Sequence, residues 1–279
     1  MSNFSPLSHS SANLLLSCEQ KYYHHKIART SADPDYEDGD ALVVGKAFHH
    51  VLEVTNHKKP KSIRDHLEKY EPLPDHYYNL VHAMLIKAYR IQKLIGLEVV
   101  ACEVELATEQ FLGYVDAIMK EKNGNWWIVD FKTAATFNYN TANLLHRDPQ
   151  MSLYAFYRHL LAEIVGLDPD KFQGTRWRVV TKSKAKQRGD ESDADFVKRL
   201  VDKSIKAFDI PIPYNMEAVA ERGFLHSRLV TRAKKLADGD ATPIKNYGNC
   251  FAYFKPCKFF SQCHGQTFSE IESPDIVEI

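Results

Sequence analysis

The sequence contains no long hydrophobic run. None of its apolar stretches approaches the roughly 18 to 20 residues that a membrane-spanning helix requires. The first residues, MSNFSPLSHSS, also lack the basic region followed by an apolar stretch that marks a secretion signal. We therefore expect a soluble, cytoplasmic protein that does not contact a membrane.

The sequence also has no excess of charge of either sign. Lys and Arg number 36 and Asp and Glu number 36, so the formal net charge at pH 7 is zero. A protein that attracts nucleic acid through its overall charge is thereby excluded, and any DNA contact must come from a local patch. The chain has 279 residues, of which 44% are hydrophobic. This composition excludes disordered and fibrous proteins and suffices for one large domain or two small ones.

Cysteine is scarce and unevenly placed. Without a secretion signal, the five cysteines argue against a disulfide framework, because cytosolic thiols stay reduced and more often bind metal or react. Cys18 stands alone near the start, and Cys102 lies in an apolar run where we expect a core residue. The other three, Cys250, Cys257 and Cys263, fall within the last 30 residues.

Hydrophobic spacing predicts an α/β protein without internal repeats. Helices are expected over residues 8–28, from about residue 44, and over 74–95, 149–166, 193–208 and 214–236. Strands are expected over residues 98–107, 110–121, 126–133 and 172–183, with a hairpin signal, Asn123-Gly124, between the second and third. This order indicates one α/β domain whose sheet is flanked by helices from both ends of the chain.

Two acidic residues and a lysine are expected at one end of neighbouring strands. Asp116 lies in GYVDAIM and Asp130 in WWIVDFKT, with the hairpin between them, and Lys132 shares a strand face with Asp130. Two converging carboxylates repel each other unless a hard cation binds between them. This set suits phosphodiester hydrolysis with Mg²⁺ or Mn²⁺, although an edge strand can also carry Asp and Lys toward solvent. The apolar neighbours of Asp130 favour a buried strand and hence the catalytic interpretation.

Four elements in order resemble a known family. Gly45-x3-His49, Asp116, Asp130-Phe131-Lys132 and Gln150-x3-Tyr154 are similar to the motifs of the PD-(D/E)XK nuclease superfamily, most closely its RecB-like exonuclease branch. The resemblance extends from about Ser8 to Cys263. It implies a restriction-endonuclease-like core with a central mixed sheet flanked by helices.

The resemblance also implies a role for each matching residue. His49, Asp116, Asp130 and the Phe131 backbone carbonyl would bind Mg²⁺ or Mn²⁺, and Lys132 would orient or activate the attacking water. Gln150 and Tyr154, one helical turn apart, would help to hold the lysine or a DNA phosphate. Taken singly, His49 could be a core or surface histidine, and the Gln–Tyr pair an ordinary packing face. Glu53, four residues after His49, is expected to be an exposed acid.

The late cysteines form a candidate metal site. Three cysteines spaced Cys250-x6-Cys257-x5-Cys263 need a fourth ligand, and Cys18 or the neighbouring His264 could provide it. In several RecB-like nucleases one early and three late cysteines bind a 4Fe-4S cluster, and the resemblance implies the same here. Structural zinc and free buried thiols remain alternatives. We expect a nuclease domain over residues 1–240 and a cysteine-rich lobe over residues 241–279, completed by Cys18.

Local basic clusters are candidates for DNA contact. One cluster follows the strand expected over 172–183 and comprises Lys182, Lys184, Lys186 and Arg188, and another lies on the last long helix. The leading function is a metal-dependent DNA exonuclease, bacterial or phage-encoded, that acts on single strands or duplex ends and could work with a helicase or recombinase partner. The alternative is an inactive nuclease-like protein that binds DNA or a partner through a structural metal site.

Overall fold

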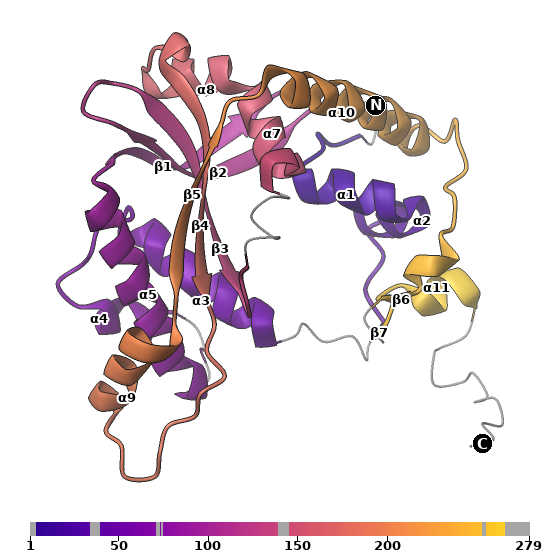
Figure 1. Ribbon diagram of the computed structural model, residues 1–279. Helices are drawn as coiled ribbons and strands as arrows, with labels where there is room; N and C mark the ends of the chain where they lie inside the picture. The colour runs from indigo at the N-terminus through magenta and orange to yellow at the C-terminus, as the bar shows by residue number, and fades with distance from the viewer. Residues whose placement is uncertain are drawn as a thin grey trace. The chain divides into compact units, whose positions relative to one another are not determined.

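The computed structural model describes residues 4–33, 40–70, 73, 75–138, 145–252 and 255–265 (Figure 1). The chain forms two compact units. The larger unit contains residues Asp38–Leu106 and Gly113–Gly223. The smaller unit contains Met1–Glu37, Ala107–Leu112 and Phe224–Ile279. The boundary near the C-terminus falls between Gly223 and Phe224.

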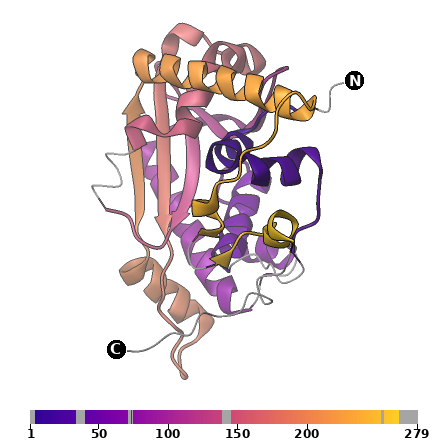
Figure 2. The ribbon, with the colours of Figure 1, turned by 90° about the vertical axis from the view of Figure 1, so that its right-hand side faces the viewer.

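A five-stranded mixed sheet forms the centre of the larger unit. Its strands lie side by side in the order β1 to β5 (Figures 1 and 2). They are β1 Glu98–Ala107, β2 Leu112–Lys120, β3 Trp126–Ala134, β4 Phe172–Thr181 and β5 Ala207–Pro213. Strand β3 pairs antiparallel with β2 and parallel with β4, and β4 pairs antiparallel with β5. The expected α/β fold with a central mixed sheet is confirmed.

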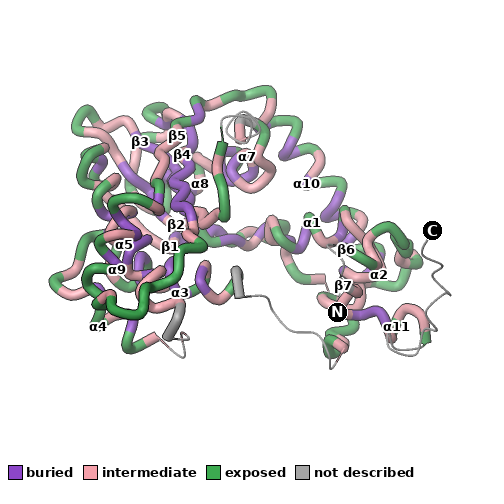
Figure 3. The backbone as a smooth tube through the Cα atoms, turned by 60° about the horizontal axis from the view of Figure 1, so that its bottom comes forward, coloured by how far each residue is buried: buried purple, intermediate pink, exposed green. Residues whose placement is uncertain are grey.

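One face of the sheet is covered by helices. They are α3 Asp40–Val54, α4 Ile63–Glu68, α5 Asp75–Ile95 and α9 Asp193–Arg199, the last continued by the π-helical turn η4 Leu200–Ser204. Phe48 and Val51 of α3 recur at helical spacing and are fully buried with Val129 and Phe131 of β3 in one apolar core. Buried residues, purple in Figure 3, occur both in the strands and in the helices. This packing fixes β3 rigidly beneath the polar residues of its other face.

Helices α7 Pro149–Phe156 and α8 Arg158–Val165 contact the sheet from the other side. Side chains alternate along a strand, so Asp130 and Lys132 point away from the core that contains Phe131. Asp148 caps α7, because its carboxylate accepts the backbone N–H groups of Gln150 and Met151. Gly166 ends α8 in the left-handed conformation, as its place after the apolar pattern predicts. The single helix expected over 149–166 is thus divided at residue 157.

Two other expectations need correction, and one helix was missed. The helix expected over 193–208 ends at residue 204, because residues 207–213 pair with β4 as strand β5, whose register is set by that partner. Helix α4 was not expected. The helix expected over 8–28 is divided into α1 His9–Ser17, α2 Glu19–Tyr22 and the π-helix η1 Tyr23–Ile27. In contrast, α10 Met216–Ala237 confirms the expected last helix.

The smaller unit joins the N-terminal helices to the cysteine-rich segment. Besides α1 and α2 it contains the short elements η5 Tyr247–Asn249, β6 Phe251–Ala252, β7 Lys255–Pro256 and α11 Phe260–His264. Glu19 pairs with Arg232 at 2.6 Å and accepts the backbone N–H of Ile244 at 3.0 Å. The Asn246 side-chain amide donates to the Ser17 carbonyl at 2.8 Å. Within the described residues, no helix is long and apolar enough to cross a membrane.

Candidate active site

The polar residues of the larger unit converge at β2 and β3. Asp130 is the centre of the arrangement, because its Oδ1 accepts hydrogen bonds from the Lys132 ammonium at 3.2 Å and from the Gln150 amide at 3.0 Å. The Lys132 Nζ also lies 2.9 Å from Asp130 Oδ2 and donates to Gln150 Oε1 at 3.2 Å. Strand β3 and helix α7 therefore hold the acid, the lysine and the glutamine in mutual contact.

Asp116 is held against the same strand. Its Oδ2 accepts the Phe131 backbone N–H at 2.8 Å, so the carboxylate of β2 is fixed beside the residue that follows Asp130. The same oxygen lies 3.5 Å from Nδ1 of His49, which α3 brings to this point. The expected metal-binding side chains, His49, Asp116 and Asp130, are thus gathered from one helix and two strands.

Tyr154 contacts the site through Gln150. Its hydroxyl donates to the backbone carbonyl of Tyr114 at 2.6 Å and accepts from the Gln150 amide at 3.3 Å. Burial raises the pKa of the Tyr154 hydroxyl, which therefore stays protonated at neutral pH. The residue joins α7 to β2 and orients Gln150.

The electrostatics of the two carboxylates are unusual. Burial, followed by the neighbouring charge of Asp116, raises the pKa of Asp130 to about 7. Burial also raises the pKa of Asp116 to about 6, although the hydrogen bond from Phe131 opposes this shift. Burial alone would lower the pKa of Lys132, but the neighbouring carboxylates, Asp130 first among them, together leave it raised, so the ammonium stays charged. Both carboxylates would gain from a further cation.

The donor atoms fit a hard divalent ion. Asp130 Oδ2 is buried and makes no hydrogen bond within the described parts of the chain, although the Lys132 ammonium lies 2.9 Å away. Burial lowers the pKa of His49, so its imidazole is neutral and can act as a ligand. Carboxylate oxygens with one imidazole suit Mg²⁺ or Mn²⁺. No group of three or more His, Cys, Asp or Glu side chains among the described residues already has metal-binding geometry.

Two residues near the site were not expected from the sequence. Glu103 of β1 is half-buried, and its pKa is raised by burial and then by the charges of Glu53 and Asp130. In the sequence, an acidic residue within an apolar strand pattern could have indicated Glu103. His57 is buried and donates to the Asp116 backbone carbonyl at 3.1 Å. No local sequence pattern predicts this contact. Glu53 itself is exposed, as expected.

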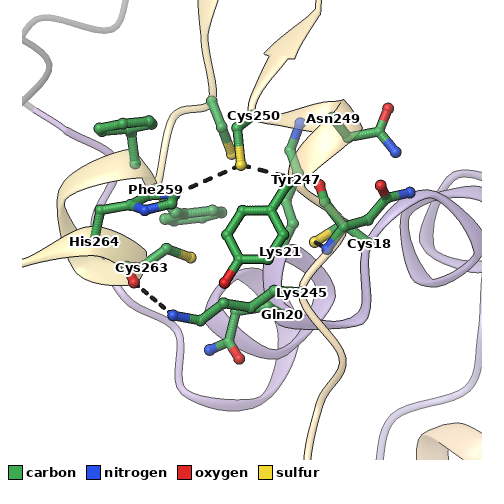
Figure 4. Close-up of a pocket in the computed structure, with 13 residues that line it drawn as sticks. Cys18, Gln20, Lys21, Lys245, Tyr247, Asn249, Cys250, Phe259, Cys263 and His264 are labelled. Atoms are coloured by element: carbon green, nitrogen blue, oxygen red, sulfur yellow. Dashed lines mark hydrogen bonds between the residues drawn. The ribbon is translucent and has the colours of Figure 1, made fainter.

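The smaller unit brings four cysteines to one pocket. Cys18, Cys250, Cys257 and Cys263 line it, together with Lys245 and His264 (Figure 4). Burial, followed by the neighbouring thiol of Cys257, raises the pKa of Cys263 to about 11 and also raises that of Cys250. The Cys250 Sγ lies 3.6 Å from Nε2 of His264. Four soft sulfur donors fit iron or zinc by their chemistry, whereas their described geometry is not already that of a metal site.

The basic residues have different surroundings. Lys184, Lys186 and Arg188 are exposed in the loop after β4, and Lys182 is half-buried. A hydrogen bond from Arg199 Nη2 of α9 to the Lys186 carbonyl, at 3.0 Å, attaches this loop to the helix. In the smaller unit, Arg232 of α10 is paired with Glu19, so the arginine charge is compensated within the protein.

Comparisons with known proteins agree with this architecture. The sequence profile of the PD-(D/E)XK nuclease superfamily matches residues 6–264. A crystal structure of a candidate exonuclease from Eubacterium rectale is similar at a TM-score of 0.52 and 12% identity, with 94% of each chain covered. The structure of SSO0001 has a TM-score of 0.25 at 12% identity, covering 75% of this chain and 81% of that one, and supports no argument. A search of curated proteins found no match. With its profile match over nearly the whole sequence, the chain belongs to the PD-(D/E)XK nuclease superfamily.

Proposed function

We propose that this nuclease is a Mg²⁺- or Mn²⁺-dependent DNA exonuclease that hydrolyses phosphodiester bonds at single-stranded or duplex ends. The observation that carries the proposal is the contact among Asp130, Lys132 and Gln150 beside Asp116. Nuclease chemistry needs a place for a divalent ion and a cation near the attacking water, and these side chains supply both. An exonuclease role in recombination, repair or phage DNA processing fits the RecB-like motif order.

Each residue has a definite task in this proposal. Asp116, Asp130 and His49, with the Phe131 carbonyl, hold the ion, which supplies Lewis acidity and lowers the pKa of its bound water. Lys132 donates hydrogen bonds that orient the water. Its own position is fixed by the Gln150 amide oxygen at 3.2 Å.

The proposed reaction cleaves the bond between phosphorus and the 3′-oxygen. Water attacks phosphorus, the P–O3′ bond breaks, and the leaving oxygen takes up a proton. The products carry a 3′-hydroxyl and a 5′-phosphate. The exposed Lys184, Lys186 and Arg188, with half-buried Lys182, would attract the phosphate backbone. Such an enzyme would act in the cytoplasm of a bacterium or of a phage's host, and a helicase or recombinase partner fits its role.

The test is digestion of end-labelled single- and double-stranded DNA with Mg²⁺, Mn²⁺ or EDTA. We expect release of nucleotides from an end with either metal and none with EDTA, and no release by Lys132→Ala. A matched control is Lys171→Ala, which changes a lysine of the 3₁₀ turn η3 Pro169–Lys171. DNA binding without hydrolysis under all conditions would favour the alternative, an inactive nuclease-like binding protein. Metal-independent cleavage would contradict the proposed chemistry.

We also propose that the cysteine-rich lobe, residues 241–279, is completed by Cys18 and holds a structural 4Fe-4S cluster. The support is that thiols far apart in the sequence line one pocket. Cys18 and Cys263 are separated by more than 200 residues, so a shared cluster closes a long loop and restricts the unfolded chain. Zinc is the alternative ion, and the 3.6 Å approach of His264 to Cys250 is the specific observation that favours it.

Metal analysis of protein purified without oxygen distinguishes an iron–sulfur cluster from zinc. We expect brown protein with about four irons per chain, as a four-cysteine cubane requires. Cys18→Ser should lose iron and thermal stability, whereas Cys102→Ser should keep the iron. Colourless protein with one zinc per chain would show that the bound metal is zinc, and the proposed link between Cys18 and the late cysteines would stand. A Cys18→Ser variant with unchanged metal content would show that another residue completes the site.

A further inference from the structure

A buried histidine supports the candidate active site from the opposite face of the sheet. His57 lies three residues beyond the end of α3, where Asn56 and His57 both have left-handed backbone conformations, with φ of 47° and 54°. The His57 N–H donates to the Leu52 carbonyl at 2.8 Å, which closes the turn. Two successive left-handed residues that are not glycine are costly and persist only where the surrounding structure holds them.

The side chain of His57 makes two contacts with the strands that carry the carboxylates. Its Nε2 lies 3.1 Å from the backbone carbonyl of Asp116, and since a carbonyl only accepts, Nε2 carries the proton. Its ring stacks on that of Phe131 at 4.7 Å between centroids and 25° between planes. Phe131 in turn donates its N–H to the Asp116 carboxylate at 2.8 Å. Through these three contacts His57 touches the Asp116 backbone directly and the Asp116 carboxylate by way of Phe131.

The buried imidazole of His57 is neutral. It is only 3% exposed, and its Nδ1 has no hydrogen-bond partner among the described residues. Burial lowers the pKa of His57 to about 4. A neutral ring gives one donor of fixed direction to the Asp116 carbonyl and adds no charge beside the carboxylates.

We propose that His57 is a positioning residue, which fixes the Asp116 carboxylate and the Phe131 backbone for the divalent ion through the Asp116 carbonyl and the Phe131 ring. This inference rests on the proposed metal-dependent function. Residues that orient metal ligands from behind commonly change metal affinity about 10- to 100-fold when replaced. His57 performs this task from the apolar face, whereas Gln150 and Tyr154 act from the polar face.

The test separates the donor from the stacked ring. His57→Gln keeps a donor near the position of Nε2, and His57→Phe keeps an aromatic ring and removes the donor. We expect His57→Phe to weaken Mn²⁺ binding about 10- to 100-fold, measured by electron paramagnetic resonance without DNA. His57→Gln should recover most of the affinity. His50→Phe is the matched control, because His50 lies on α3 and packs on Tyr70.

A second measurement needs no metal. Amide hydrogen exchange in EDTA should be faster at Phe131 in His57→Phe than in wild type and near normal in His57→Gln. If His57→Phe does not fold, His57→Asn replaces it, because its shorter amide does not reach the carbonyl. Wild-type Mn²⁺ affinity and wild-type Phe131 exchange in the donor-free variant would overturn the inference. If wild type binds no Mn²⁺, the proposed function fails, and the exchange measurement still decides the role of His57.

Discussion

Replacing Asp130 by asparagine should stabilise the metal-free protein and remove a ligand of the proposed metal site. The carboxylate is 1% exposed, and burial with the neighbouring Asp116 raises its pKa to about 7. In the unfolded chain an aspartate titrates at about 3.9. As pH rises from 4 to 7 the unfolded state loses its proton before the folded state does, so the folded state loses stability across this window. Above pH 7 the ionised, buried Asp130 lowers the free energy of unfolding by its full amount.

The size of the effect follows from the pKa difference. About three pKa units correspond to about 4 kcal/mol, which is an upper limit for the gain on neutralising this side chain. The amide oxygen introduced by Asp130→Asn would still accept the Gln150 amide proton, as Asp130 Oδ1 does now at 3.0 Å. Lys132 would lose its 2.9 Å ion pair and keep its contact with Gln150. We therefore expect Asp130→Asn to gain about 2 kcal/mol at pH 8, or roughly 4 °C in Tm.

Thermal and urea unfolding in EDTA at pH 5 and pH 8 measure this difference. The variant should be more stable than wild type at pH 8 and much closer to it at pH 5, where the wild-type carboxyl is protonated. Mn²⁺ at 100 times its Kd should stabilise wild type by about 2.7 kcal/mol and leave the variant unchanged. A variant that is less stable at pH 8 in EDTA, or equally shifted at both pH values, would refute the reasoning.

Three further predictions concern single residues. Lys132→Ala should reduce kcat at least 100-fold and leave DNA affinity within a few fold, as measured by filter binding and single-turnover cleavage, because the amine serves the transition state more than phosphate contact. His49→Ala should cause a smaller loss that high Mn²⁺ partly restores, since one ligand of several is removed; no change at any metal concentration would show a packing role. Gly174→Ala should cost more than about 2 kcal/mol in urea unfolding, because φ is 141° and a Cβ would lie 2.2 Å from the Ile212 carbonyl oxygen, whereas Gly96→Ala has open space and should cost less.

The carboxylate site was predictable because it depends on local periodicity. Residues two apart share a strand face, which places Lys132 beside Asp130, and residues four apart share a helix face, which places Tyr154 beside Gln150. Both pairs are in contact, at 2.9 Å for the first and 3.3 Å for the second. A short hairpin then brings Asp116 onto the neighbouring strand. The family motifs consist of such local spacings, which is why they could be identified in the sequence.

Features that depend on distant partners could not be predicted in this way. Strand β5 contains Pro211 and Pro213 and follows a helical pattern without a break, and its identity as a strand comes from pairing with β4. Arg178 is 0% exposed inside that pair, where it donates to Asp209 at 3.0 Å. A sequence window shows an arginine in an apolar strand and gives no sign of the acid 31 residues later. His57 likewise depends on strands that follow it by about 60 residues.

The charge balance of the described site agrees with its donor atoms. Asp116, Asp130 and Glu103 have raised pKa values, with burial as the first cause in each case, and Lys132 is the cation that contacts Asp130. When all of these groups are ionised, the carboxylates outnumber the single ammonium. A further cation would offset the excess negative charge in this buried site. Because protons compete for the same oxygens, we expect the affinity of the proposed site for a divalent ion to rise as pH increases through 6 and 7. The burial that destabilises the metal-free protein would then also determine the pH range in which this site binds metal.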